Sequence, residues 1–217
     1  MEYSQWRSDL FDHGPPYDPC VVELSDELDS VSLEETFDYL DRMLIDPELH
    51  ILYSPTQLAL GLSMAFNNCF TNFPFCYLRI GTEDRRIYGI LNLKNLYDNF
   101  FGKYCLDPYP SKSHSGSMQH LCENFWERFI LFPGEPTSVR MVHAGLDVME
   151  YALSCRNDHC VASALSGIAS WTYACRQSEY GISRPMELIR AWVETSSTRN
   201  PSLVHYGRQM LENVTVG

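Results

Sequence analysis

The chain has 217 residues, of which 45% are hydrophobic, and carries a formal net charge of −12. This composition supports a substantial core, and no apolar run reaches the length of a transmembrane helix. The acidic balance disfavours binding to nucleic-acid phosphates and to anionic membranes. The first ten residues are polar and acidic, unlike a targeting segment, so we expect a cytosolic protein.

The negative charge is concentrated in the first quarter of the chain. Residues 1–50 hold fourteen Asp and Glu against Arg7 and Arg42, whereas residues 51–217 hold equal numbers of acidic and basic residues. Such an asymmetry predicts a solvated acidic arm or a surface that attracts a basic partner.

Composition also divides the chain into an acidic N-terminal arm, residues 1–31, and one helical domain, residues 32–217. Prolines in the arm argue against a long helix, and its aromatic residues predict that it folds back onto the body. The polar loop 105–117 is predicted to be mobile and could separate the domain into sub-halves 32–104 and 118–217.

The first clear helix is predicted from Leu33 to Leu44. Ser32 and Glu35 form a capping-box pattern, and apolar residues recur at helical spacing. Glu34, Asp38 and Asp41 fall on the opposite side, with Glu35 adjoining. The helix should therefore present an acidic ridge to solvent.

Seven further helices follow from caps and apolar periodicity. The segment after Ser54 and Pro55 is apolar nearly all round and should be central. Another pattern, capped by Thr137, runs through Val139, Val142 and Leu146. The predicted helices are 55–66, 83–103, 118–132, 138–153, 158–176 with Asp158 as its N-cap, 185–195, and a last one from Pro201.

About eight helices and no convincing strand pattern predict an all-α fold, an irregular antiparallel helical array. The helix 158–176 contains many small residues and should pack between two neighbours, since small side chains permit close approach. Alternate helix starts in the C-terminal half are about 40 to 50 residues apart, a spacing typical of HEAT-like helical hairpins.

The eight cysteines are interpreted as reduced residues in a chain that is not cysteine-dense. The alternative is a metal site built from Cys155, His159 and Cys160, with His143 one helix away. Zinc sites usually show paired spacings such as CxxC, and none occurs here. We therefore predict neither a metal nor another cofactor.

Enzyme signatures are also missing from the sequence: no HExxH, GxSxG or P-loop pattern occurs. His120, Cys122 and Glu123 could suggest a thiol site, but a cysteine on an aromatic helix face is typical of a core. Glu123 and Glu127 are interpreted as a solvated helix face. We therefore assign no catalytic residue.

Three segments of the C-terminal third carry a family resemblance: CVASALSGIASW at 160–171, ELIRAW at 187–192 and NPSLVHYGRQ at 200–209. They resemble small all-helical bacterial proteins of uncharacterised function, in which a related helix precedes a HEAT-like hairpin. Ser166 and Ser170 stand where histidines are expected, which argues against a histidine-based site. The resemblance implies a bacterial, all-helical protein similar to toxin-neutralising immunity proteins.

The functional expectation is a non-enzymatic inhibitor that neutralises a basic, toxin-like protein by stoichiometric occlusion. A helical scaffold or oligomerising protein is the alternative, and a metal-dependent enzyme the third hypothesis. Acidic side chains should meet Lys and Arg of the partner and speed the encounter. The predicted partner-binding residues are Asp26, Glu27, Asp29, Glu34, Glu35, Asp38 and Asp41.

Overall fold

The computed structural model describes residues 1–110, 116–177, 183–196 and 199–216. Within these ranges the chain forms helices and no strand, apart from one isolated bridge between Gly134 and Thr137. The all-α prediction is confirmed. Residues 111–115 of the predicted mobile loop lie outside the described residues, as do residues 178–182.

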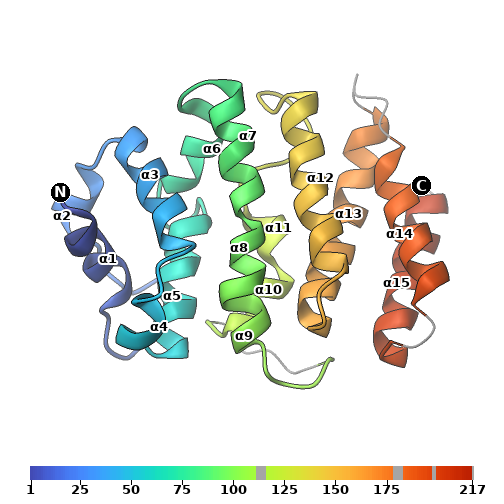
Figure 1. Ribbon diagram of the computed structural model, residues 1–217, viewed down its shortest axis with the longest axis horizontal. Helices are drawn as coiled ribbons and strands as arrows, with labels where there is room; N and C mark the ends of the chain where they lie inside the picture. The colour runs from blue at the N-terminus through green and yellow to red at the C-terminus, as the bar shows by residue number, and fades with distance from the viewer. Residues whose placement is uncertain (111–115, 178–182, 197–198, 217) are drawn as a thin grey trace.

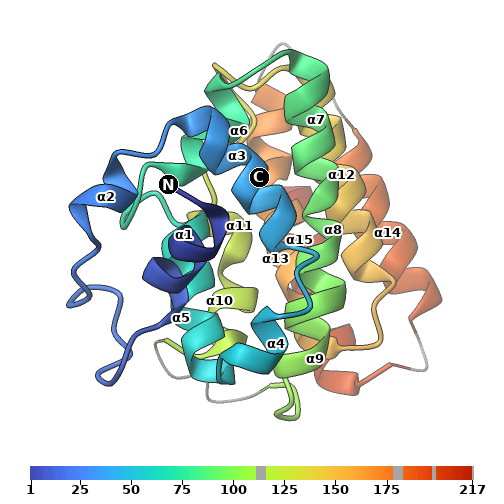
Figure 2. The same cartoon turned by 60° about the vertical axis from the view of Figure 1, so that its left-hand side comes forward.

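The main helices form two layers that run from one end of the molecule to the other (Figures 1 and 2). One layer contains α3 (Leu33–Met43), α7 (Glu83–Asn92), α8 (Lys94–Leu96), α12 (Val139–Leu153) and α14 (Arg184–Thr195). The other contains α5 (Pro55–Phe66), α10 (Met118–Glu123), α11 (Phe125–Arg128), α13 (Asp158–Gln177) and α15 (Pro201–Val216). The shorter elements are α1 (Tyr3–Phe11), α2 (Asp26–Asp29), α4 (Leu49–Leu52), the 3₁₀ turn η1 (Phe73–Phe75), α6 (Cys76–Arg79), the π-helix η2 (Tyr97–Phe101) and α9 (Gly102–Tyr104).

Capping residues start several helices as predicted, with two corrections. Ser32 forms the predicted capping box at the start of α3, and Ser54 forms one with Gln57 at the start of α5. The helix α12 is capped by Ser138 and not by Thr137, because the Ser138 hydroxyl accepts from Met141 N while Thr137 is buried. At α13 the cap is Asn157, whose Oδ1 accepts from His159 N at 3.0 Å, and Asp158 is the first helical residue.

Two predicted helices are broken. The predicted helix 83–103 is divided at Leu93 and loosens into the π-helix η2 before ending at Tyr104. The predicted helix 118–132 is wrong in its length, because it is interrupted at Asn124 and ends at Arg128. The Asn124 side chain donates to the His120 carbonyl at 2.8 Å, an interaction that competes with the helical ladder.

The N-terminal segment is part of the hydrophobic core. Trp6 is completely buried on α1, and its ring lies 5.6 Å from that of Tyr39 and 5.8 Å from that of Phe73. The segment thus folds back onto the body. Its nine-residue helix was not predicted, because the prolines that suggested irregular structure all follow Gly14. The division into an arm and a domain stays a prediction.

The helix α13 occupies the centre of the C-terminal half, where it contacts α10, α11, α12, α14 and α15. Two glycines make its close approach possible. A Cβ on Gly167 would lie 2.7 Å from the Trp126 ring, and one on Gly145 of α12 would lie 2.5 Å from the ring of Trp171. Small residues are therefore required where bulky rings cross between the helices.

A buried hydrogen-bond chain joins three elements beside this contact. Trp126 Nε1 donates to the Tyr97 hydroxyl at 2.8 Å, and that hydroxyl lies 3.2 Å from Ser163 Oγ. Burial raises the pKa of Tyr97 well above its usual range, so the phenol stays neutral. The chain satisfies polar atoms from η2, α11 and α13 that would otherwise be buried without partners.

Replacing Gly145 with Ala should destabilise the protein by about 1–3 kcal/mol, because the new methyl group would overlap the Trp171 ring. Ala has the higher helix propensity, which offsets part of this cost. Urea denaturation measures the change. Gly14→Ala is the control, since a Cβ there meets no atom within 4 Å. Equal stability of the two variants would contradict the packing argument.

Candidate functional site

The predicted acidic surface lies at the N-terminal end of the helical array, on α2 and α3 (Figure 1). Asp26 and Glu27 are exposed on α2, and Glu34, Glu35 and Asp38 are exposed on α3. The Asp29 side chain lies outside the described part of the structure. Whether these residues bind a partner stays a prediction.

The acidic ridge of α3 is partly neutralised by Arg85 of α7. Its guanidinium forms ion pairs with Asp38 at 2.9 Å and with Asp41 at 2.7 Å, and its Cζ lies 3.8 Å from the centroid of the Phe37 ring. Asp41 also accepts from Asn92 Nδ2 at 3.0 Å. The Asp41 side chain is only 16% exposed, so the expectation that it faces solvent is wrong.

The remaining acidic residues of α2 and α3 are less compensated. Arg7 forms ion pairs with Asp46 and Glu48, so the charges of these two acids are also compensated. Asp26, Glu27 and Glu34 form no ion pair with any residue that the structure describes. The strongest part of the acidic surface is therefore α2 and the first turn of α3.

Exposed apolar residues at the same end were missed by the sequence reasoning. Ile51 is 82% exposed and Leu52 is 54% exposed on α4, and Ile45 follows α3 with 63% exposure. The helix α4 is four residues long, too short for periodicity to reveal. Among the aromatic residues of this end, Tyr39 packs on Tyr3 and Tyr53 packs on Phe11.

His159 is the most constrained titratable group among the proposed metal ligands. Its Nδ1 lies 2.8 Å from Glu123 Oε1, and its Nε2 lies 2.8 Å from the Asp107 carbonyl oxygen. Since both partners only accept, the ring donates from both nitrogens as an imidazolium. Burial opposes this charge, but the hydrogen bonds to Glu123 and Asp107 outweigh it and raise the pKa of His159.

An imidazolium has no lone pair for a metal ion. Among the residues described here, no group of three or more His, Cys, Asp or Glu side chains could hold one. Cys122, the other thiol that invited a chemical interpretation, is fully buried in the core.

A surface cavity of about 460 Å³ lies between α13 and α15. Its lining includes Glu127, Tyr173, Arg176 and Tyr206. Ser166 donates to Glu127 at 3.1 Å from the side of α13. The small residues of α13 therefore serve two purposes, because they admit neighbouring helices and leave this space open.

Comparisons with protein-family models, with curated proteins and with solved structures find no match. No helix in the described ranges is both long and apolar enough to cross a membrane.

Replacing Arg85 with Met should destabilise the protein by about 1–3 kcal/mol, because it leaves the half-buried Asp41 carboxylate without its charged partner. Arg140→Met is the matched control. Arg140 also bridges two carboxylates, Glu83 and Asp84, but from an exposed position, so its loss should cost less. Urea denaturation of both variants measures the difference, and an equal loss would show that burial is irrelevant here.

The His159 imidazolium should make stability depend on pH. Because the folded-state pKa is raised, its contribution is complete below the unfolded pKa of about 6.5 and is lost as pH rises through the folded pKa. The free energy of unfolding is measured by denaturation at a pH below the unfolded-state pKa and at a pH above the folded-state pKa. The wild type should be less stable at the higher pH, and His159→Gln should lack this loss of stability. The control His205→Gln, on the exposed face of α15, should keep the wild-type dependence.

Proposed function

We propose that the protein binds a basic protein through the acidic N-terminal end of its helical array and inhibits it by occlusion. The observation that carries the proposal is the charge distribution: the first fifty residues account for the whole net charge of −12, and they fold as one end of the array. Asp26, Glu27 and Glu34 are exposed there without ion pairs from the described residues.

The partner would be met by two kinds of contact. Uncompensated carboxylates on α2 and α3 attract a basic surface over a distance and speed the encounter. Ile45, Ile51 and Leu52 provide exposed apolar area close by in the chain, and desolvated apolar contacts supply most of the affinity in such interfaces. Asp41 is held by Arg85 and contributes little.

A cytosolic, immunity-like protein that neutralises a basic toxin would use such an acidic surface. The charge distribution favours a partner that is basic, and it favours neither a nucleic acid nor an anionic membrane. The toxin assignment rests on the resemblance of the C-terminal third, whereas the basic character of the partner rests on the charges.

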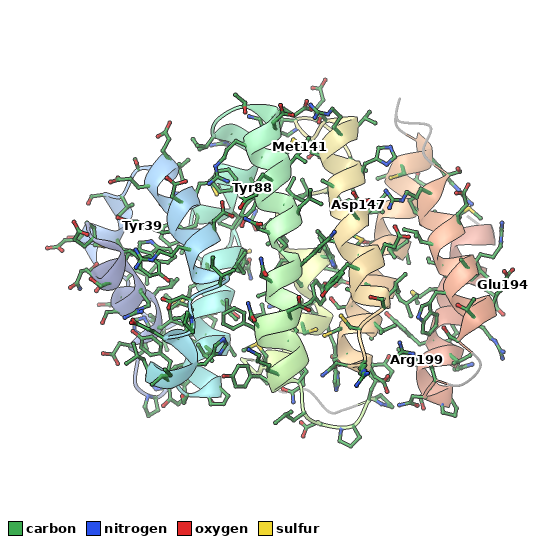
Figure 3. All side chains as sticks on the ribbon, in the orientation of Figure 1. Tyr39, Tyr88, Met141, Asp147, Glu194 and Arg199 are labelled. Carbon is green, nitrogen blue, oxygen red and sulfur yellow. The ribbon has the colours of Figure 1, made fainter. Side chains whose placement is uncertain are left out.

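The test compares two triple charge reversals on the intact protein. Asp26→Lys/Glu27→Lys/Glu34→Lys changes the acidic end, and Glu187→Lys/Glu194→Lys/Glu212→Lys makes the same change at the opposite end. Glu194 projects from α14 far from Tyr39 of α3 (Figure 3). The basic protein captured by the wild type from the source cell is purified, and stopped-flow association is followed at several ionic strengths.

The first variant should associate about tenfold more slowly and lose most of the salt dependence, because steering depends on local charge. The second variant should retain the rate within a small factor. Equal effects of the two variants would mean that only net charge matters. An unchanged rate in the first variant, or capture of no basic protein, would refute the acidic-end proposal.

A second candidate is a helical scaffold that binds a peptide or assembles with itself. The cavity between α13 and α15, with Glu127 and Arg176 among its lining residues, favours this alternative. Light scattering after size exclusion separates the possibilities: a stable homo-oligomer supports the scaffold, and a monomer that binds a basic protein supports the inhibitor.

A further inference from the structure

Two surface cavities beside α13 join into one groove. The larger, of about 460 Å³, lies between α13 and α15, and the smaller, of about 290 Å³, lies between Tyr109 and the helices α10, α11 and α13. Glu127, Ser166 and Tyr206 line both cavities, so the two spaces meet at these residues. The larger cavity alone is within the range of about 300–1,000 Å³ that is typical of small-molecule sites. The groove lies away from α2 and α3, so a ligand bound there is independent of the acidic end (Figure 1).

Glu127 supplies a negative charge where the two cavities meet. Its Oε1 accepts a hydrogen bond from Ser166 Oγ at 3.1 Å, and it forms no ion pair with any residue that the structure describes. Glu123, the other carboxylate of the smaller cavity, is paired with the buried His159. Glu127 is therefore the carboxylate that a ligand in the groove can use.

Two tyrosine rings accompany this carboxylate. Tyr206 lines both cavities, and the centroid of the Tyr109 ring lies 6.4 Å from that of Tyr206 at an interplanar angle of 60°. Burial raises the pKa of both phenols, to about 12 for Tyr109, so the rings stay neutral. The faces of neutral aromatic rings attract organic cations, and a carboxylate attracts them by its charge. Rings and carboxylate together provide the recognition chemistry of an organic ammonium ion.

The larger cavity offers apolar surface to the remainder of such a ligand. Ala169 and Tyr173 line it from α13, and Met210 lines it from α15. The Tyr173 side chain is 65% exposed, so its ring is free to pack on an apolar group. Arg176 also lines this cavity, and its guanidinium donates to Met186 Sδ of α14. A second positive charge on the ligand would be repelled by Arg176, so the groove favours a single one.

We propose that the groove binds a small organic ammonium ion that carries one positive charge and an apolar body, such as an arylalkylamine. The ammonium group lies where the cavities meet, donating to the Glu127 carboxylate with its charge against the Tyr206 ring. The apolar body extends along α13 into the larger cavity, against Tyr173 and Met210. The net charge of −12 also favours a cation over an anion of the same size.

Three probes that share one apolar body test the charge preference. Phenylbutylamine is a cation at neutral pH, phenylbutanol is neutral and phenylbutyrate is an anion. Calorimetric titration of the full-length protein gives a Kd for each probe. The amine should bind about tenfold more tightly than the alcohol, because a hydrogen bond between charged groups contributes more than a neutral one. The anion should bind most weakly, and equal affinities of the amine and the alcohol would overturn the proposal.

Variants locate the site. Glu127→Gln should weaken binding of the amine about tenfold and change binding of the alcohol little, because only the amine uses the carboxylate charge. The matched control is Glu212→Gln, which removes an exposed carboxylate of α15 that lines neither cavity. Tyr206→Leu should weaken the amine more than the alcohol, since the ring face is lost. Circular dichroism confirms that each variant is folded, and the exposed Glu127 still tests the site if the Leu variant is not.

A lysine side chain of another protein presents the same ammonium chemistry, so acetyl-lysine amide serves as a further probe. Weaker binding of this probe than of phenylbutylamine supports a free small molecule. Binding at least as tight would overturn the proposal in favour of a protein side chain. Equal losses of amine affinity in Glu127→Gln and Glu212→Gln would show that only net charge matters, and a wild-type protein that binds none of the probes would refute the site.

Discussion

The close approach of α13 to its neighbours is the constraint on which the C-terminal half depends. Gly145 leaves room for the Trp171 ring, and Gly167 leaves room for the Trp126 ring. Each indole therefore fills the space that a missing Cβ leaves on a neighbouring helix. The polar chain through Trp126, Tyr97 and Ser163 then fixes the third element, η2, against the same contact. Packing and hydrogen bonding specify one arrangement together.

Electrostatics divides the molecule differently from packing. The core is one cluster that extends from Tyr3 to Leu203, but the net charge belongs to the first fifty residues. Arg85 links the two parts of the chain. It belongs to the segment with balanced charge, and it forms ion pairs with two carboxylates of the acidic first fifty residues. The acidic side chains without ion pairs from described residues lie on α2 and at the start of α3. The same end of the molecule also exposes apolar residues of α4. Charge with exposed apolar area is what a protein-binding surface needs.

The buried imidazolium of His159 holds the segment that follows α9 against the helices beside it. It holds the chain after α9 through the Asp107 carbonyl and α10 through Glu123. Asn157 and Asn200 hold the same stretch, through the carbonyls of Cys105 and Tyr109. One buried ion thus positions a connecting segment.

The amino-acid sequence alone determined the fold class, the start of α3 and α5, and the location of the net charge. These follow from local rules, since caps and apolar periodicity involve residues within one or two turns. The tertiary structure alone decided the features that depend on distant residues. The sequence pattern predicts that Asp41 faces solvent, whereas in the structure it pairs with Arg85 of α7. The helix α1 is stabilised by the burial of Trp6 against residues distant in the sequence, such as Phe73.

The candidate sites divide in the same way. Exposed acids such as Glu34 were predictable because the opposite face of a short amphipathic helix is solvated by default. The hydrogen bonds of His159 were not, because Glu123 and Asp107 belong to segments that no spacing rule connects to it. The interruption at Asn124 was also hidden, since its side-chain bond competes with the helix only in this geometry. Local periodicity determines which helices form, and long-range contacts decide which of their side chains remain available for chemistry or binding.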